Sequence, residues 1–563
     1  MKVIIVGGVA GGATAAARIR RLDEHAEITV YERSGYISYA NCGLPYYIGD
    51  VITDPEELTL QTPESFFKRF RINMKIHHEV ISIHPDHKTV SVKNLENGEI
   101  FEENYDKLIL SPGAKPTQPR LPGMGIDKLF TLRTVEDTFR IKEYINKNHP
   151  KSAVLAGGGF IGLELAENLR ELGMDVTIVQ RPKQLMNPFD PDMASMIHNE
   201  MRKHGIKLVL GYTVEGFKEK DNGVEVLLKD NPSLQADMVV LAIGVTPDTV
   251  LAKEAGLELG IKESIVVNDR METSVPDIYA AGDAVQVKHY VTGNDALISL
   301  AGPANKQGRI IADNICGGDS RYLGSQGSSV IKVFDMTAAT TGINETNAKK
   351  SGLEVDTVIL SPMSHAGYYP GGKVMTMKVV FEKETYRLLG AQIIGYEGVD
   401  KRIDVLATAI HAGLKATQLK DLDLAYAPPY SSAKDPVNMA GFMIDNIAKG
   451  TLKQWHLEDM DKISRDKSVV LLDVRTVGEF NRGHMKGFNN IPVDELRERI
   501  SEIEKGKPVY LICQSGLRSY IASRILEGNG YETYNFSGGF RFYDAVVNDR
   551  ALIEKAYACG MDY

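Results

Sequence analysis

Cysteine is scarce in this chain of 563 residues, which contains four: Cys42, Cys316, Cys513 and Cys559. They are widely separated and form no disulfide framework of the kind that staples small secreted proteins. This usage favours a reducing cytoplasm, where an exposed cysteine is more often reactive than structural. Cys316 and Cys559 have no motif around them, and we expect them to be structural.

Basic excess and long apolar runs are also missing. The net charge of −9 and the pI near 5.9 argue against a nucleic-acid partner. No stretch approaches the 18 or so consecutive apolar residues of a membrane-spanning helix. The opening "MKVIIVGGVAGG" resembles a signal peptide, but glycines interrupt its apolar run and arginines follow, so it predicts a strand, a turn and a helix. We therefore expect neither a membrane nor a nucleic-acid partner.

The first motif is a glycine turn between an apolar strand and an alanine-rich helix, "KVIIVGGVAGGATAAARIRRL". Gly7 and Gly12 fit the G-x-G-x-x-G pattern, and Val9 holds its middle place. Such a turn lets the backbone approach a pyrophosphate, whose charge the helix N-terminus stabilises. A second strand ends at Glu32, where a carboxylate can bind a ribose hydroxyl. The alternative is a packing turn in another α/β unit.

The pattern recurs in "SAVLAGGGFIGLELAENLRELGMDVTIVQRP", with Gly157, Gly159 and Gly162 in full register. Two dinucleotide folds imply two dinucleotides, a bound flavin and a diffusing nicotinamide. The second strand ends at Gln180, which lacks the carboxylate that would repel a 2′-phosphate, and Arg181 or Lys183 can attract one. We therefore expect NADPH use or mixed use with NADH. A solvated Arg181 is an equal alternative.

Three further segments complete the order of motifs: "YDKLILSPGAKP", "DMVVLAIGVTPDT" and "TSVPDIYAAGDAV". Over residues 1–315 the chain resembles the two-dinucleotide flavoprotein disulfide reductases. The resemblance implies that Asp283 binds the FAD ribitol and that Glu164 lies near the nicotinamide and the flavin. It also implies cofactor contacts at Arg33, Val80, Ser111, Gly113, Gly244 and Ala301.

Cys42 stands where most members of that family carry the second of two cysteines separated by four residues, and Ile37 takes the other place. An internal disulfide is therefore excluded. A single thiolate beside a flavin can still be oxidised to a sulfenate or to a mixed disulfide with a small thiol. The stretch "SYANCGLPYYIGD", with Ser38 and Asn41, resembles the coenzyme A-disulfide reductase branch. There, Cys42 alternates between a thiolate and a mixed disulfide with coenzyme A.

Basic residues follow in positions that suit the phosphates of coenzyme A. A solvated basic face is the alternative for this group. Where relatives have a lysine that contacts coenzyme A, this chain has Phe70. The expected substrate contacts on the first helix are Thr14, Arg18, Arg20 and Arg21, and "FFKRFRI" adds Lys68, Arg69 and Arg71.

Residues 323–445 resemble the dimerisation domain of the same family. Tyrosines lie in "SHAGYYPGG" and in "DLAYAPPYSSAKDPVN". In the resembled branch, one tyrosine from each segment reaches the partner's active site, and we assign these roles to Tyr368 and Tyr426. A phenol there can protonate a leaving thiolate. We expect Tyr369 and Tyr430 to be packing residues and Lys434 to contact substrate.

The last segment, 456–563, resembles a single rhodanese domain through "DVR…E…GHMKG…IP", "CQSGLRS" and "NFSGGF". Cys513 ends a strand, and the following loop leads through Arg518 into a helix. Converging N–H groups, the helix start and Arg518 favour a thiolate that can carry sulfane sulfur as a persulfide. A phosphatase-like loop is disfavoured, because four residues between Cys513 and Arg518 are too few to surround a phosphate.

The sequence thus predicts an α/β protein with two Rossmann-like domains, an α+β dimerisation domain and an α/β rhodanese domain. We place the FAD domain at 1–115 and 250–322, the NAD(P)H domain at 116–249, and a linker at 446–455. We expect a homodimer that reduces coenzyme A disulfide, coenzyme A persulfide or polysulfide, with no metal. The alternatives are a sulfenate-based peroxide or oxygen reductase, for which the first helix offers only His25, and a sensor without turnover.

Overall fold

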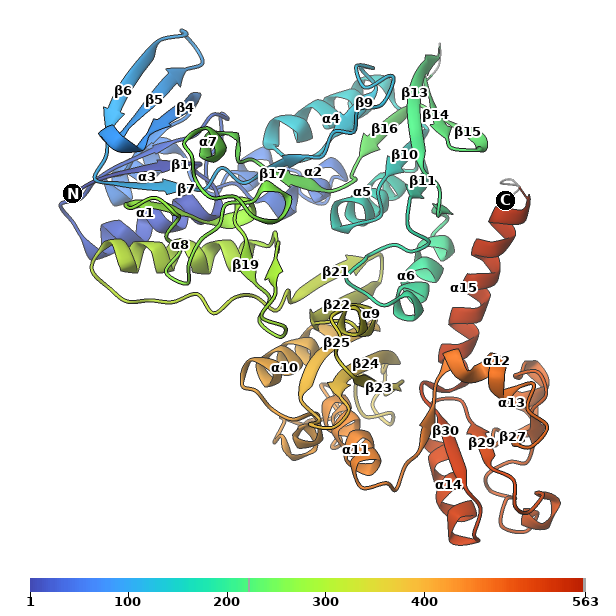
Figure 1. Cartoon of the computed structure of the whole chain (residues 1–563). Helices are drawn as coiled ribbons and strands as arrows, with labels where there is room; N and C mark the ends of the chain where they lie inside the picture. The colour runs from blue at the N-terminus through green and yellow to red at the C-terminus, as the bar shows by residue number, and fades with distance from the viewer. Residues whose placement is uncertain (221–222, 560–563) are drawn as a thin grey trace. The chain divides into compact units, whose positions relative to one another are not determined.

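The computed structural model describes residues 1–220 and 223–559, with side-chain surroundings given as far as residue 555. The chain forms two compact units (Figure 1). The first comprises Met1–Pro182 and Ile206–Gly327. The second comprises Lys183–Gly205 and the chain from Ser328 onward. Within the described residues, no helix combines the length and the apolar character needed to cross a membrane.

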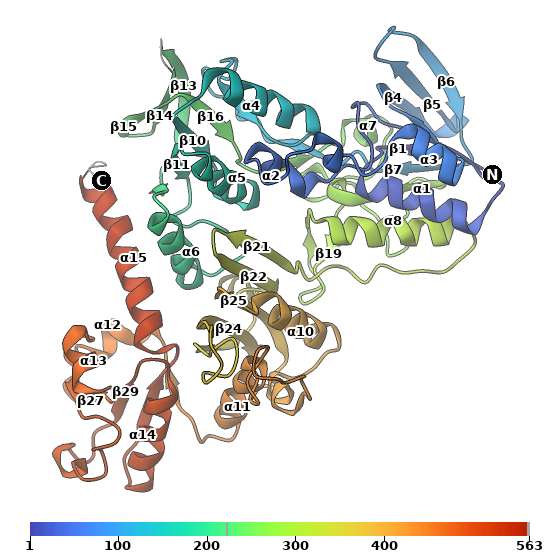
Figure 2. The same cartoon turned by 180° about the vertical axis from the view of Figure 1, so that it is seen from behind.

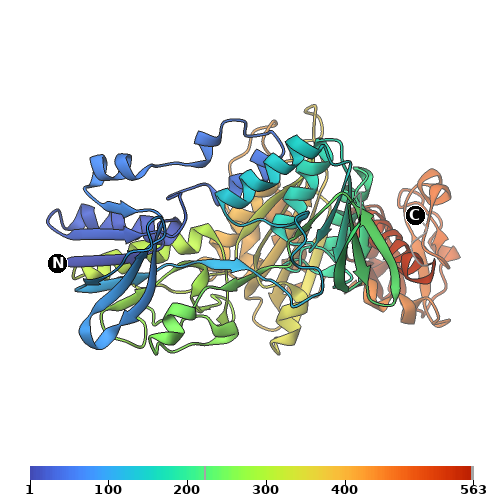
Figure 3. The same ribbon diagram turned by 90° about the horizontal axis from the view of Figure 1, so that it is seen from above.

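A parallel sheet in the order β18-β7-β1-β2-β3 organises the first half of unit 1. Its strands are short buried apolar runs, which is typical of a sheet covered on both faces. Helix α1 (Ala10–Leu22) packs along α8 (Ala301–Ile315), so segments far apart in sequence lie side by side (Figures 2 and 3). The strands are β1 (Lys2–Val6), β2 (Glu27–Tyr31), β3 (Asn73–Lys75), β7 (Lys107–Leu110) and β18 (Ile278–Ala280).

The second parallel sheet of unit 1 has the order β12-β11-β10-β16-β9. Helix α5 (Phe160–Glu171) follows β10 as α1 follows β1, so the repeated motif is a repeated fold. Its strands are β9 (Leu129–Thr131), β10 (Ser152–Ala156), β11 (Asp175–Gln180), β12 (Lys207–Leu210) and β16 (Met238–Leu241).

Smaller elements complete unit 1. Antiparallel sheets are built from β4 (His78–His84), β5 (Thr89–Asn94) and β6 (Ile100–Asn104), and from β13 (Val214–Lys220), β14 (Gly223–Leu228) and β15 (Asn231–Ala236). The pairs are β8 (Ala114–Pro116) with β17 (Val245–Pro247), and β19 (Val287–Lys288) with β20 (Asp295–Ala296). The remaining helices are α2 (Leu44–Ile48), α3 (Pro63–Phe70), α4 (Val135–Asn148) and α7 (Val250–Glu254).

Unit 2 contains an antiparallel sheet in the order β21-β22-β25-β24-β23, the α+β region that was predicted as the dimerisation domain. The strands are β21 (Ser329–Val333), β22 (Met336–Gly342), β23 (Val355–Leu360), β24 (Met375–Glu382) and β25 (Leu388–Gly395). The helices are α6 (Pro191–Lys203), α9 (Glu345–Lys350), α10 (Val399–His411) and α11 (Pro436–Ala448).

A parallel sheet in the order β26-β30-β29-β27-β28 forms the last part of unit 2. Its strands are β26 (Gln454–Trp455), β27 (Val470–Asp473), β28 (Asn489–Asn490), β29 (Val509–Ile512) and β30 (Thr533–Phe536). The helices are α12 (Met460–Ile463), α13 (Val477–Arg482), α14 (Leu517–Gly528) and α15 (Gly539–Cys559).

Strand β26 lies inside the segment that was predicted to be a linker. It pairs in parallel with β30, and buried Trp455 packs against Phe536 with ring centroids 4.5 Å apart. This pairing gives the tryptophan an apolar site that the sequence pattern alone did not indicate. The surroundings of the Cys559 side chain lie outside the described residues.

A buried ion cluster ties the segment before α6 to the sheet of unit 2. The Lys378 ammonium lies 3.2 Å from Asp190, 2.7 Å from Asp192 and 2.7 Å from Glu345. Asp190 also accepts hydrogen bonds from the Thr346 hydroxyl and the Thr346 N–H. Lys378 is 1% exposed, so its charge depends on these carboxylates for stabilisation.

We expect Lys378→Met to destabilise unit 2 strongly, because two buried carboxylates, Asp190 and Asp192, and the partly exposed Glu345 lose their common cation. Breaking a buried pair of this kind costs ~3–5 kcal/mol. Guanidinium unfolding followed by circular dichroism measures the change, with Lys383→Met, an exposed lysine at the end of the same hairpin strand, as the matched control. An equal midpoint for the two variants would contradict the role of Lys378.

Candidate active site

The first glycine turn brings β1, β7 and α1 so close together that side chains have no room. A Cβ on Gly7 would lie 2.1 Å from the Ser111 carbonyl oxygen, and a Cβ on Gly12 would lie 1.9 Å from the Gly7 carbonyl oxygen. Gly7 also has φ +96°, a left-handed conformation that favours glycine. Val9 is the N-cap residue of α1 and makes no side-chain capping bond, so the first-turn N–H groups are open to a phosphate.

Glu32 lies at the end of β2 and faces this turn. Its carboxylate accepts the Gly8 N–H at 2.8 Å and the Ser34 N–H at 2.9 Å. Burial raises its pKa, and the two N–H donors oppose that rise. Two N–H groups leave lone pairs on both oxygens for the hydroxyls of a ribose. The turn and Glu32 thus fit an adenine dinucleotide at the switch point between β1 and β7.

The second glycine turn repeats the geometry around β10. Gly157 has φ +120°, and a Cβ on Gly162 would lie 2.1 Å from the Gly157 carbonyl oxygen. Gln180 takes the place of Glu32: its amide oxygen accepts the Gly158 N–H at 3.1 Å. Arg181 follows it and is exposed. Gly159 is the N-cap residue of α5 and faces open space. A second dinucleotide therefore fits here as well.

The other predicted cofactor positions lie around these turns or at their edges. Asp283 pairs with Arg133 at 2.6 Å, a partner that no sequence motif indicated. Arg33 pairs with Asp248 at 2.8 Å, so its charge is already compensated. Ser111 lies at the first turn, whereas Val80 is buried in β4. Gly113 and Gly244 have left-handed φ angles of +70° and +107°. Ala301 is the first residue of α8.

Cys42 lies in the short helical turn Asn41–Gly43, and α2, which follows, packs against α5. A Cβ on Gly49 would lie 2.0 Å from the Asn168 amide oxygen, so this glycine permits the close packing. The Cys42 thiol is exposed at the edge of this packing. Partial enclosure and then the Glu164 carboxyl raise the pKa of Cys42. Burial, and then Glu167, raises the pKa of Glu164 to about 7.

The predicted substrate residues of α1 divide into two kinds. Arg20 was expected to contact phosphate, and this is wrong: it is buried, and its guanidinium donates to main-chain carbonyls, among them those of Ala26 and Phe70. Its bond to the Arg71 carbonyl holds Arg71 against the end of α1. Arg18 pairs with Asp313 at 2.7 Å, and the Thr14 hydroxyl donates to the Asn305 side chain. The remaining predicted basic residues are exposed: Arg21, Lys68, Arg69 and Arg71.

Close to Cys42, Ser38 adopts φ +45°. The Asn41 amide oxygen is buried with no hydrogen-bond partner among the described residues. Such an oxygen is costly unless a ligand donates to it, so Asn41 fits a substrate contact. Lys434, on the other compact unit, is exposed.

In unit 2, the structure brings together the two tyrosines that the sequence singled out. The Tyr368 and Tyr426 hydroxyls lie 2.6 Å apart, and both side chains are exposed. The hydrogen bond to Tyr368 raises the pKa of Tyr426. Below them, buried Arg402 holds both loops: it donates to the Ser364 carbonyl at 2.9 Å and pairs with Asp435 at 3.0 Å.

The loop after β29 surrounds the buried Cys513. Its sulfur accepts the Gly516 N–H at 3.1 Å and the Ser519 hydroxyl at 3.2 Å. Arg518 makes two 2.7 Å hydrogen bonds to Glu479, and they are the main cause that lowers the pKa of Glu479 to about 2. The convergence of donors was predicted, whereas the roles of Ser519 and Glu479 were missed. An Arg–Glu pair formed across 39 residues leaves no local signal in sequence.

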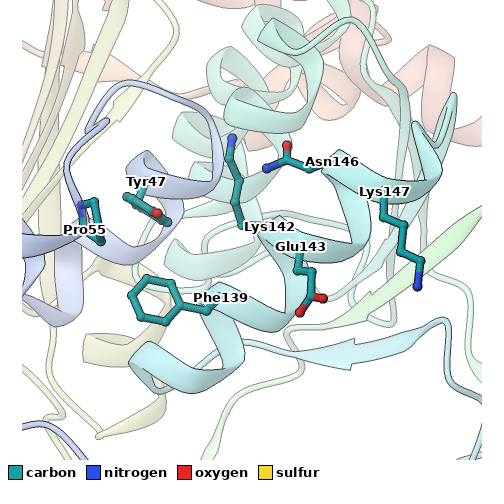
Figure 4. A pocket seen from close by; sticks show the side chains of 7 residues that line it. All are labelled: Tyr47, Pro55, Phe139, Lys142, Glu143, Asn146 and Lys147. Carbon is teal, nitrogen blue, oxygen red and sulfur yellow. The ribbon is translucent and has the colours of Figure 1, made fainter.

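An open cavity of about 650 Å³ lies between the region of α2 and helix α4 (Figure 4). Tyr47 and Phe139 meet edge to face in its wall, with ring centroids 5.6 Å apart. Lys142 reaches across to Asp50 at 2.6 Å. None of the predicted catalytic residues lines this cavity; its walls are Tyr47, Pro55, Phe139, Lys142, Glu143, Asn146 and Lys147.

Glu164→Gln is expected to lower the pKa of Cys42. With a pKa of about 7, Glu164 is ionised wherever the thiol titrates, and its charge disfavours the thiolate. The rate of iodoacetamide labelling at Cys42 as a function of pH measures the change. Glu171→Gln, at the exposed end of the same helix, is the matched control. An unchanged or raised labelling pKa would show that Glu164 does not act on this sulfur.

Family models match the chain in three places. The model for pyridine nucleotide-disulphide oxidoreductases matches residues 1–308, and the model for their dimerisation domain matches 328–436. A model for rhodanese-like domains matches 456–545. The coenzyme A disulfide reductase of Staphylococcus aureus strain JH9 is 38% identical over 442 residues, which cover 78% of this chain and 99% of that protein.

Two solved structures resemble the chain over nearly its whole length. Reduced Bacillus anthracis CoADR-RHD is 48% identical, with a TM-score of 0.95 and 98% of each chain covered. A NAD-dependent persulfide reductase from A. fulgidus is 38% identical, with a TM-score of 0.90, covering 96% of this chain and 100% of that one. The predicted fold class and family resemblance are confirmed. This chain belongs to the pyridine nucleotide-disulphide oxidoreductases and carries a C-terminal rhodanese-like domain.

Proposed function

We propose that this protein uses NAD(P)H and FAD to cleave the sulfur–sulfur bond of coenzyme A disulfide, coenzyme A persulfide or polysulfide at Cys42. The observation that carries the proposal is the lone, exposed Cys42 thiol near Glu164, with Ile37 buried where a second cysteine would stand. One sulfur without a partner has to bond to its substrate, because an internal disulfide cannot form.

Two cofactor sites support this chemistry. Gly7, Gly12 and Glu32 would hold FAD, with Asp283 at its ribitol, and the second turn with Gln180 would hold NAD(P)H. When bound, the flavin supplies the electron pair, received as hydride from the nicotinamide, that reduces a disulfide. We propose NADPH or mixed use, because Gln180 carries no charge to repel a 2′-phosphate and Arg181 is free to approach one.

The Cys42 thiolate attacks one sulfur of the substrate, forms a new sulfur–sulfur bond and expels the other sulfur as a thiolate or hydrosulfide. Asn41 offers its unpartnered amide oxygen to a donor of the pantetheine arm. Arg21 and Arg71 are exposed for the phosphates, whereas Arg18 first has to leave Asp313. Two electrons then return Cys42 to its thiolate and release the second thiol.

Tyr368 and Tyr426 are proposed to protonate the departing thiolate in the partner's active site, which makes the homodimer the active form. Their mutual hydrogen bond keeps the two phenols together, so one can donate while the other stabilises it. The rhodanese-like domain, through Cys513, is proposed to pass sulfane sulfur to or from coenzyme A or a similar thiol. The scattered cysteines support a cytoplasmic site of action.

Intact mass under non-reducing conditions, before and after dithiothreitol, tests the central step. One coenzyme A adduct is expected on the wild type and none on Cys42→Ser, together with loss of NAD(P)H oxidation by coenzyme A disulfide; Cys316→Ser is the matched control. Oxygen adducts alone would favour the sulfenate-based peroxide or oxygen reductase. A stoichiometric oxidation without sustained NAD(P)H consumption would favour the sensor.

Arg402→Met is expected to lower kcat by roughly tenfold to a hundredfold, because displaced tyrosine loops misplace a proton donor. In a Tyr426→Phe background, Arg402→Met should lower kcat much less, since the Tyr426 proton donor is already absent. Arg387→Met, an exposed arginine in the same unit, is the control. Fully additive effects of the two substitutions would separate Arg402 from the tyrosine pair.

A further inference from the structure

The sulfur of Cys513 is held by uncharged donors. The Gly516 N–H and the Ser519 hydroxyl both point at it, and Cys513 is fully buried. Asn535 of β30 donates to the Gly516 carbonyl at 3.3 Å and so helps to fix the loop. These contacts point two hydrogen-bond donors at the sulfur without placing a free cation against it.

Two arginines beside this loop, Arg475 and Arg518, are already neutralised by carboxylates. Arg518 is bound by both oxygens of Glu479, and buried Arg475 is bound by both oxygens of Asp473. Thr476 also donates to Glu479, which fixes that carboxylate in place. The four charges cancel, so a Cys513 thiolate leaves the site with a net negative charge. The main-chain N–H of Arg541 donates a hydrogen bond to the Gln514 carbonyl. The Arg541 side chain is exposed, so water screens its charge.

The surface beside the loop carries three exposed aliphatic side chains. Leu517, which precedes Arg518, is 60% exposed, and Ile521 follows one turn later on the same face of α14 at 43%. Val477, two residues before Glu479, is 52% exposed. An incoming molecule therefore meets aliphatic side chains on both sides of a neutral Arg–Glu pair, which suits a molecule with an organic arm.

We propose that the Cys513 site takes its sulfur from the persulfide of an organic thiol and discriminates against inorganic dianions such as thiosulfate. The inference rests on the proposed function and names the sulfur donor of its rhodanese-like domain. Two negative charges brought to a buried thiolate, with no unpaired buried cation beside it, are repelled. An organic persulfide carries at most one charge at the reacting sulfurs, and its arm lies on Leu517 and Ile521.

The transfer involves no net oxidation or reduction. The Cys513 thiolate attacks the outer sulfur of R–S–SH, a bond forms between Sγ and that sulfur, and the S–S bond of the persulfide breaks. The thiol leaves as R–S⁻, and the proton stays on the transferred sulfur, which gives Cys513–S–SH. Glu479 acts as a specificity residue, since it neutralises the arginine that would otherwise bind an anion.

Sulfur loading of the full-chain holoenzyme in the Cys42→Ser background tests the proposal. Coenzyme A persulfide or sodium thiosulfate is added without NAD(P)H, and peptide mass mapping follows the gain of one sulfur at Cys513, with Cys42→Ser, Cys513→Ser as the blank. Loading from the persulfide is expected to be at least about tenfold faster. Equal or faster loading from thiosulfate would overturn the proposal.

Substitutions at the pair give the second test. Glu479→Gln frees the charge of Arg518 and is expected to speed thiosulfate loading by about tenfold, with little change for the persulfide. Adding Arg518→Gln restores neutrality and should restore the discrimination, even if each single variant is less stable. Glu495→Gln, which removes a surface carboxylate paired with Arg499, is the matched control. A discrimination that stays the same in Glu479→Gln would refute the role of this pair. Failure of the proposed reductase would instead appear only in the NAD(P)H assay of Cys42.

Discussion

The structure depends on backbone segments that approach too closely for any side chain. Gly7 against Ser111, and Gly157 against Ala242, join neighbouring strands at the points where a dinucleotide would bind. Gly308 of α8 packs directly against Gly11 of α1: an added Cβ would lie 2.4 Å from the Gly11 carbonyl oxygen. This glycine therefore allows the two helices to pack closely. The absence of a side chain at Gly49 likewise allows α2 to pack closely on α5, which brings Cys42 near Glu164. Because these glycines have no side chain, the backbone segments can approach closely enough to position both glycine turns and Cys42.

Charge compensation is the second organising feature. Lys378, Arg402, Arg475 and Arg518 all have carboxylate partners, and the first three are almost fully buried. Because each buried charge is paired, these residues fix loops and segments in place and attract no ligand. The basic groups left exposed, such as Arg21, Arg71 and Arg181, are therefore the ones that suit phosphates. The structure thus separates the cations that are held by carboxylates from those that are exposed, a distinction that the sequence does not make.

The two cysteines with predicted chemistry have opposite surroundings. Cys42 is exposed at the surface, but partial enclosure and then the Glu164 carboxyl raise the pKa of its thiol, so a thiolate there would need stabilisation by other groups. Cys513 is buried, and hydrogen-bond donors point at its sulfur. The first suits a sulfur that exchanges with large substrates. The second suits a protected persulfide that has to be shielded from water and other thiols.

The sequence by itself determined the fold class, the two glycine turns typical of dinucleotide sites and the rhodanese-like segment, and it predicted the redox role of Cys42. Each of these depends on local spacing: a glycine turn between a strand and a helix, or a cysteine at the end of a buried strand. The domain boundaries and the roles of the site residues stay predictions. Sequence reasoning placed Arg20 wrongly, because an arginine on an amphipathic helix has the same pattern whether it faces phosphate or main-chain carbonyls.

The tertiary structure alone decided which charges are free and which residues meet across long separations. Arg133 with Asp283, Glu479 with Arg518, and Tyr368 with Tyr426 are separated by 150, 39 and 58 residues. No periodicity or motif encodes such pairs, because they form only when different loops are carried to one place by the packing of the elements between them. Local spacing thus defined the chemistry available to this protein, and long-range packing defined how that chemistry is positioned.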